Sequence, residues 1–178
     1  MLSNVRLSGV RFSFGAALIA LAAFAAAGPA AAADETKRFD DWELQCRDRA
    51  PEGFPKCIIT QNVVAEETKL GLLSAAIYFR PGVNTPSLGF NLAPQAIKEA
   101  GMVLQIDTKP ALELPIQSCN PNICVVRAAL RDQVLNMLRS GTRGIVGFKI
   151  PPDQRVAAQL SLKGFGNAYK ALEQRKGR

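Results

Sequence analysis

The sequence has 178 residues, a net charge of +7 and no histidine. The missing histidine excludes Ser-His-Asp triads, Cys-His nucleophile pairs and metal sites built on histidine. The charge is unevenly distributed, because residues 34–119 hold nine basic and twelve acidic side chains, whereas residues 120–178 hold eleven basic and three acidic ones.

Residues 1–33 have the features of a secretory signal peptide. Two arginines precede an apolar run over residues 12–27, and four alanines then provide an A-x-A cleavage site before Asp34. A membrane-spanning helix needs about 20 apolar residues, and this run reaches that length only by crossing a Gly-Pro pair. We therefore expect cleavage and export, which leave a single domain of residues 34–178 without a transmembrane segment.

The four cysteines, Cys46, Cys57, Cys119 and Cys124, all lie in the predicted mature part. An even number of cysteines in an exported protein predicts disulfides, and four cysteines allow three pairings. The two local pairs, Cys46–Cys57 and Cys119–Cys124, are the simplest of the three and are the ones we expect. Their spacings fit neither a Cys-x-x-Cys redox motif nor the usual four-sulfur zinc site.

The dominant pattern of the mature part has a period of two residues. In residues 39–46, Trp42, Leu44 and Cys46 share one face, as expected for a half-buried strand. Trp42 is expected in the core, near a disulfide, rather than in a ligand site. Further strands are predicted at residues 57–64, 72–80, 102–107, 112–117, 124–130, 145–150 and 156–162.

Two short helices interrupt the strands. Residues 131–139 place apolar side chains on one face, and Gly141 stands where a C-terminal cap is expected. A second helix is predicted after Gly164, where apolar residues recur at i, i+3, i+4 and i+7. Seven or eight short strands with two short helices predict a mainly β fold, a two-sheet β-sandwich, with a small barrel as the alternative.

No group of residues has the spacing of a catalytic, cofactor-binding or metal-binding site. Ser161 and Lys163 are one residue too close for the S-x-x-K motif, and they lie on a predicted strand. The glycine-rich residues 141–147 match neither of the phosphate-binding motifs G-x-G-x-x-G and G-x-x-x-x-G-K-(S/T). Asp40 and Asp41 are neighbours on a predicted strand, so their carboxylates should point to opposite faces. We expect no enzyme activity and no cofactor.

The basic residues near the C-terminus are the best candidates for a binding surface. An exported basic surface meets anionic lipid, lipopolysaccharide or an acidic protein rather than nucleic acid. The candidate patch consists of Arg127, Arg131, Arg139, Arg143 and Lys163. Two loops are further candidates, namely residues 81–89 and residues 120–123 inside the Cys119–Cys124 ring.

Four separate segments resemble the invasion-associated locus B family. Residues 39–46 read F-D-D-W-E-L-Q-C and contain an aromatic-x-Asp-Trp strand that leads to the first cysteine. Cys57 is followed by Gln61, and residues 116–119 (I-Q-S-C) resemble the start of the second cysteine pair. Residues 161–165 (S-L-K-G-F) and the helix after them resemble the closing segment of the family.

This resemblance implies an exported α-proteobacterial protein with an immunoglobulin-like β-sandwich. Its members are periplasmic or associated with the outer membrane, and pathogenic relatives are linked to host-cell invasion. It brings no catalytic residues, so the prediction is a non-enzymatic envelope protein that binds a partner or the envelope surface. The alternative is a periplasmic enzyme inhibitor that presents its 120–123 loop, or an enzyme with an unrecognised site.

Overall fold

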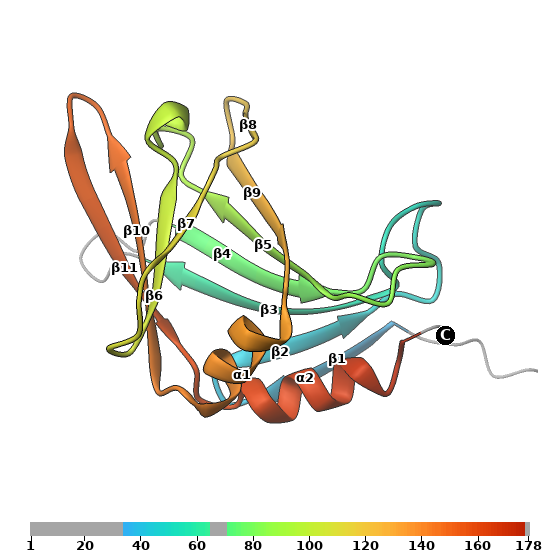
Figure 1. The fold of residues 1–178 in the computed structure, drawn as a ribbon. Coiled ribbons are helices and arrows are strands. Elements are labelled where there is room, and N and C mark those ends of the chain that lie inside the picture. The colour runs from blue at the N-terminus through green and yellow to red at the C-terminus, as the bar shows by residue number, and fades with distance from the viewer. Residues whose placement is uncertain (1–33, 65–70, 177–178) are drawn as a thin grey trace, which may run out of the picture. The chain divides into compact units, whose positions relative to one another are not determined.

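The computed structural model describes residues 34–64 and 71–176. The predicted signal peptide lies outside the described residues. In the described part, antiparallel strands form two sheets, and two helices lie side by side against them (Figure 1). No helix of these two stretches has the length and hydropathy that a membrane crossing requires.

The larger sheet has seven strands, and most neighbours in it are also neighbours in sequence. Hairpins therefore build most of this sheet. In spatial order the strands are β1 (Glu35–Phe39), β2 (Trp42–Cys46), β3 (Cys57–Val64), β4 (Gly71–Tyr78), β5 (Ser87–Leu92), β9 (Cys124–Ala129) and β8 (Ser118–Cys119).

The smaller sheet has four strands. In spatial order they are β11 (Gln154–Ser161), β10 (Arg143–Ile150), β6 (Met102–Ile106) and β7 (Leu112–Leu114). The helices are α1 (Asp132–Ser140), α2 (Phe165–Glu173) and a single 3-10 turn, η1 (Lys98–Ala100). The predicted mainly β, two-sheet sandwich with two short helices is thus confirmed.

Three strands, β1, β5 and the two-residue β8, were not predicted from the sequence. Strand β1 is separate from β2 because Asp40 adopts a positive φ of 51° and reverses the chain between them, so the strand predicted over residues 39–46 begins only at Trp42. The predicted 81–89 loop includes the first three residues of strand β5. Five of its six residues are buried, and a strand buried on both faces shows no alternation in its sequence.

The core forms between the sheets from the inward-facing residues of both. Trp42 is 1% exposed, and its ring meets the ring of Phe165 from α2 edge to face, with 5.0 Å between the centroids. Helix α2 packs on β1, β2 and β3, and α1 packs on α2. The core role predicted for Trp42 is therefore confirmed.

Helix α1 ends at a predicted glycine, and helix α2 begins after another. The N–H of Gly141 donates to the carbonyl of Met137 at 2.8 Å and closes α1. A Cβ atom at Gly141 would lie 2.8 Å from Cγ2 of Ile106, so the chain passes too close to the core for a larger residue. Helix α2 follows Gly164 directly.

Two disulfides are present, and they have the expected pairing. Cys46 and Cys57 are opposite each other in the β2–β3 hairpin, and Cys119 and Cys124 are opposite each other in the β8–β9 hairpin. Each bond therefore closes the loop of its own hairpin. The first bond fixes the base of residues 47–56, and the second fixes the base of residues 120–123.

Candidate functional site

Three of the segments that carry the family resemblance meet around the side chain of Gln61, whereas residues 116–119 lie at the β8 edge of the larger sheet. The Gln61 amide is buried on β3. Its Nε2 donates to the carbonyl oxygens of Asp41 and Ser161 at 3.1 and 3.0 Å, and its Oε1 accepts the N–H of Ser161 at 2.8 Å. We call Asp41, Trp42, Gln61, Ser161 and Gly164 the Gln61 clamp, because they join the β1–β2 turn to the end of β11.

Ser161 is occupied by structural hydrogen bonds. Its Oγ donates to Oδ2 of Asp41 at 2.6 Å, and its carbonyl also accepts the indole N–H of Trp42 at 2.9 Å. The ammonium of Lys163 is 3.5 Å from Oδ1 of Asp40, so it forms an ion pair with this acid. The Ser161 hydroxyl thus lies in a hydrogen-bond network that supports the fold.

Gly164 brings the start of α2 against the β1–β2 turn. It adopts a φ of 83°, and a Cβ atom at this position would lie 2.0 Å from the carbonyl oxygen of Phe39. Only glycine combines this conformation with such a close approach. The S-L-K-G-F segment, the Asp-Trp pair and Gln61 are therefore parts of one structural joint.

The predicted basic patch is distributed over both sheets and α1. Arg127 lies on β9, Arg131 precedes α1, Arg139 lies in α1, Arg143 begins β10 and Lys163 follows β11. The guanidinium of Arg139 lies 4.6 Å over the ring of Tyr169 and 3.8 Å from the carboxylate of Glu173. Two of the five charges are thus paired locally, and a common binding surface of all five stays a prediction.

A groove of about 510 Å³ lies where three segments meet. We call it the end groove. Its walls are the β2–β3 loop (residues 50–57), the β4–β5 loop (residues 79–84) and the end of α2 with residues 175–176. Figure 1 shows the two loops next to each other, with the C-terminal end of α2 nearby. These segments come from the beginning, the middle and the end of the described chain.

The apolar part of the end groove is unusual in its exposure. The side chain of Phe54 is 62% exposed, the highest value among the large hydrophobic residues of the described part. Phe79 and Leu172 line the groove beside it. An exposed aromatic side chain in a concave site is typical of a surface that binds a partner.

The charged part of the end groove is strongly basic. Lys56, Arg80, Arg175 and Lys176 line it, whereas Glu52 is the one acid of the lining. The ammonium of Lys176 lies 5.1 Å from the centre of the Phe79 ring, which holds this cation over the apolar wall. The groove therefore offers positive charge next to aromatic surface.

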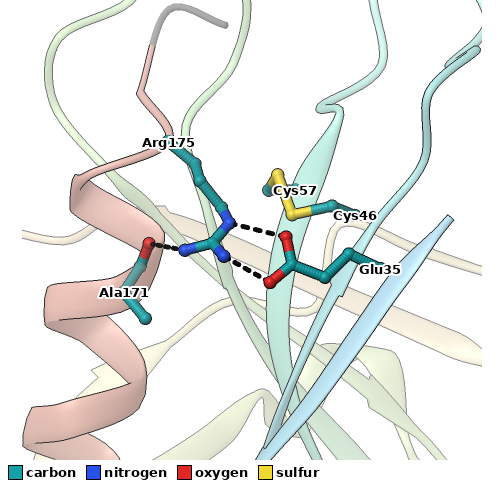
Figure 2. A network of polar contacts seen from close by, with 5 residues as sticks. All are labelled: Glu35, Cys46, Cys57, Ala171 and Arg175. Atoms are coloured by element: carbon teal, nitrogen blue, oxygen red, sulfur yellow. Dashed lines mark hydrogen bonds and ion pairs between the residues drawn. A yellow bond between two sulfur atoms is a disulfide. The ribbon is translucent and has the colours of Figure 1, made fainter. Parts of the chain in front are cut away.

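Arg175 differs from the other cations because it is already paired. Figure 2 shows its guanidinium between Glu35 and the carbonyl of Ala171, beside the Cys46–Cys57 disulfide. Nε donates to Oε2 of Glu35 at 3.1 Å, and Nη2 contacts the other carboxylate oxygen. Since this pair joins α2 to β1, it fixes one wall of the groove and neutralises one of its charges.

The loops of the groove are held by backbone hydrogen bonds. The N–H of Phe54 donates to the carbonyl of Pro51 at 3.0 Å, and the N–H of Arg47 donates to the carbonyl of Lys56 at 2.8 Å. The N–H of Val83 donates to the carbonyl of Arg80 at 3.0 Å. Both loops are therefore ordered turns that present the lining side chains in defined positions.

The sequence indicated only part of this site. The predicted 81–89 loop supplies residues 81–84 to the lining, but its other half begins β5 at Ser87. Phe54 and Lys56 lie between the strands predicted at residues 39–46 and 57–64, where the sequence pointed to no functional residue. The available signal was an aromatic residue in a loop rich in proline and glycine, but no pattern in the sequence placed it near α2.

The predicted 120–123 loop lies outside the groove lining. Oδ1 of Asn120 accepts the N–H groups of Asn122 at 2.8 Å and Ile123 at 2.9 Å, so the side chain stabilises the turn inside the Cys119–Cys124 ring. Pro121 is exposed at its tip. The ring is a rigid, projecting loop.

The lining of the end groove contains a disulfide but no free thiol. Cys57 is the one cysteine in its lining, and it is bonded to Cys46. Among the described residues, no group of three or more cysteine, aspartate or glutamate side chains is arranged to hold a metal ion. The other charged, polar and aromatic side chains of the lining are four cations, Glu52, Asn84 and the rings of Phe54 and Phe79.

Comparisons with known proteins agree with this fold. The sequence model of the invasion associated locus B (IalB) family matches residues 42–173. Two relatives, both called invasion protein B homologues, come from Brucella abortus strain 2308 and from Brucella abortus biovar 1 strain 9-941. Each is 29% identical over 174 residues, which cover 97% of this chain and 98% of the relative.

A solved structure has the same fold. The crystal structure of invasion associated protein B from Bartonella henselae superposes with a TM-score of 0.68 at 18% sequence identity. The match covers 81% of this chain and 99% of the other. The family match includes both disulfides and the Gln61 clamp from Trp42 onward. This chain therefore belongs to the invasion associated locus B family.

Proposed function

We propose that this chain is an exported envelope protein that acts by binding a partner in the end groove and catalyses no reaction. The observation that carries the proposal is the lining of the end groove, which brings the exposed ring of Phe54 together with several cations. Aromatic residues and arginine are enriched in protein-binding surfaces, and the groove presents Phe54 with Arg80. Disulfides and the predicted signal peptide support a location in the periplasm or at the outer membrane.

The absence of catalysis is supported by how the reactive side chains are used. The Ser161 hydroxyl bonds to Asp41, and all four cysteines are in disulfides. The sequence contains no histidine to act as a base near neutral pH. The names of the relatives refer to invasion, and a protein that binds a partner outside the cytoplasm is consistent with such a role.

Photo-crosslinking in the intact envelope of the native organism tests the binding proposal. Phe54 is replaced by a photoreactive benzoyl analogue of phenylalanine, and the same analogue replaces Val103 as the control. Val103 is also an exposed hydrophobic residue, but it lies on β6 outside the groove. We expect a specific adduct from position 54 only. Equal adducts from both positions, or none from either, would overturn the proposal.

Export has its own test. Mass spectrometry of the protein isolated from the periplasmic and outer-membrane fractions should find a mature chain that begins at Asp34. A chain that keeps residues 1–33, or that remains in the cytoplasmic fraction, would contradict export while leaving the groove untouched.

The rigid ring at residues 120–123 supports an enzyme inhibitor as a second candidate function. A loop held by a disulfide and by the Asn120 side chain resembles a preorganised inhibitory loop. A screen against periplasmic proteases tests this candidate. Inhibition should disappear in a Cys119→Ser/Cys124→Ser variant that remains folded, and no inhibition by the unaltered protein excludes it.

A further inference from the structure

We infer that the end groove recognises an extended acidic segment of a partner protein that carries one apolar side chain among its carboxylates. The apolar side chain packs against Phe54 and Phe79, and the carboxylates pair with Lys56, Arg80 and Lys176. This inference rests on the proposed binding function and specifies the chemistry of the ligand.

The charges that line the groove select an anionic ligand. Among the described residues, no ion-pair partner lies within 4 Å of Lys56, Arg80 or Lys176, whereas Arg175 is paired with Glu35. Of the described residues that line the groove, Glu52 is the only acid beside these three cations. Complementary charge steers a ligand toward a site and discriminates against ligands of the same charge, so an acidic segment fits and a basic one is repelled.

The aromatic lining selects an apolar group next to those charges. Phe54 loses exposed surface when a ligand side chain covers it, and burial contributes about 25 cal/mol per Å² of apolar area. Phe79 and Leu172 add further apolar surface to the lining. The volume of about 510 Å³ accommodates a large side chain and part of the backbone beside it.

The shape of the site favours a peptide segment over a lipid surface. Phe54 belongs to the lining of a groove that has walls on three segments. A flat bilayer reaches side chains that project from a convex surface, whereas an extended chain can enter between walls. The ordered turns around Phe54 and Val83 reduce the entropy that is lost on binding, as expected for a preformed peptide site.

The pairing of Arg175 permits a test in which the affinity of the end groove for an acidic segment should rise. Its guanidinium lines the groove but is neutralised by Glu35. Glu35→Gln removes the negative charge and leaves a fourth cation of the lining free to pair with ligand carboxylates. A groove that binds an acidic segment should therefore bind it more tightly after this change, which a purely structural role of the ion pair does not predict.

The experiment uses the mature chain, 34–178, and a fluorescent peptide with capped ends, Gly-Asp-Glu-Asp-Phe-Glu-Asp-Gly. Fluorescence anisotropy measures its dissociation constant at two salt concentrations. The comparison peptides replace either the single phenylalanine by serine or all acids by lysine. The variants are Phe54→Ala, the pair Lys56→Glu with Arg80→Glu, and Glu35→Gln. Lys109→Glu is the matched charge control, because Lys109 is exposed and lies outside the groove lining.

We expect Phe54→Ala and the double charge reversal each to weaken binding about tenfold, which corresponds to about 1.4 kcal/mol. Glu35→Gln should strengthen binding about threefold, and Lys109→Glu should leave it unchanged. Thermal unfolding of each variant shows that its fold is retained. Equal binding of the acidic and basic peptides, or equal binding by Phe54→Ala, would overturn the inference.

Vesicles separate the lipid explanation from the peptide explanation. If vesicles with one-third phosphatidylglycerol bind through Phe54 and the acidic peptide does not, the groove is a lipid site and our inference is wrong. If neither probe binds while position 54 still gives a specific envelope adduct, the ligand class is wrong and the proposed binding function stands. Loss of that adduct as well would remove both.

Discussion

The Gln61 clamp and the end groove use polar side chains in opposite ways. In the clamp, the amide of Gln61 makes three hydrogen bonds and is buried, and Ser161 bonds with its backbone and its hydroxyl. In the groove, three cations and the ring of Phe54 face solvent. The segments that identify the family therefore stabilise the fold, whereas the candidate binding surface draws on Phe54, Arg80 and Lys176, which lie outside those segments.

Truncation of the aromatic side chain in each region should give the largest difference. Trp42→Ala removes a buried ring and its hydrogen bond to Ser161, and we expect a loss of about 3–5 kcal/mol in the free energy of unfolding. Phe54→Ala should change that free energy by less than about 0.5 kcal/mol, because the ring is exposed. Urea denaturation measures both, and a similar loss in both variants would contradict the distinction.

The two disulfides should separate stability from binding. Replacing both cysteines by serine should cost about 3 kcal/mol for the Cys46–Cys57 bond and about 2 kcal/mol for the Cys119–Cys124 bond, because the first closes a longer loop. Only the first loop lines the end groove. Peptide affinity, measured where both variants are folded, should therefore fall for the first pair alone. An equal fall in peptide affinity after loss of the Cys119–Cys124 bond would show that the β2–β3 loop does not shape the end groove.

Loss of the clamp amide should have a smaller effect than loss of Trp42. Gln61→Leu keeps most of the side-chain volume but leaves the N–H of Ser161 without its partner, and an unsatisfied buried group costs about 1–3 kcal/mol. Gln159→Leu is the matched control, since Gln159 is exposed on β11. Chemical denaturation of both variants should show a loss for Gln61→Leu only, and peptide binding should be unchanged in each.

The smallest expected effect is on the pH dependence of stability. Burial raises the pKa of Tyr169 above its ordinary value of 10.0, and Glu173 raises it further, while Arg139 opposes the shift. The neutral phenol is thus favoured in the folded state. Its contribution is complete below pH 10 and is lost as the pH rises through the higher folded-state pKa.

Ultraviolet titration of a Tyr78→Phe variant measures this ionisation, because the chain has only two tyrosines. Phenolate absorbance should appear at a higher pH in the folded protein than in the urea-unfolded protein. Coincident titration curves would contradict the assigned burial of Tyr169. The groove contains no tyrosine in its lining, so peptide binding should not follow this transition.

The strands that show alternation were predictable from local sequence, and those without it were not. Leu104 alternates with exposed neighbours on β6, so its strand was predicted at residues 102–107, one residue longer than observed. Strand β5 is buried on both faces and carries Gly89. Because its sequence does not alternate, half of it was predicted as a loop. Strand β1 is exposed along most of its length, and it owes its place to pairing with β2 rather than to an apolar pattern.

The sequence by itself determined the two-sheet class, the two helices and the local disulfide pairs, because alternation, helical spacing and short cysteine loops are local properties. It also supplied the residues of the clamp, without showing that they meet. Only the tertiary structure decided that Gln61 joins the β1–β2 turn to Ser161, 100 residues away. It also decided that Phe54, Arg80 and Lys176 share one groove. Such contacts depend on how the sheet folds over α2, and no short stretch of sequence carries that information.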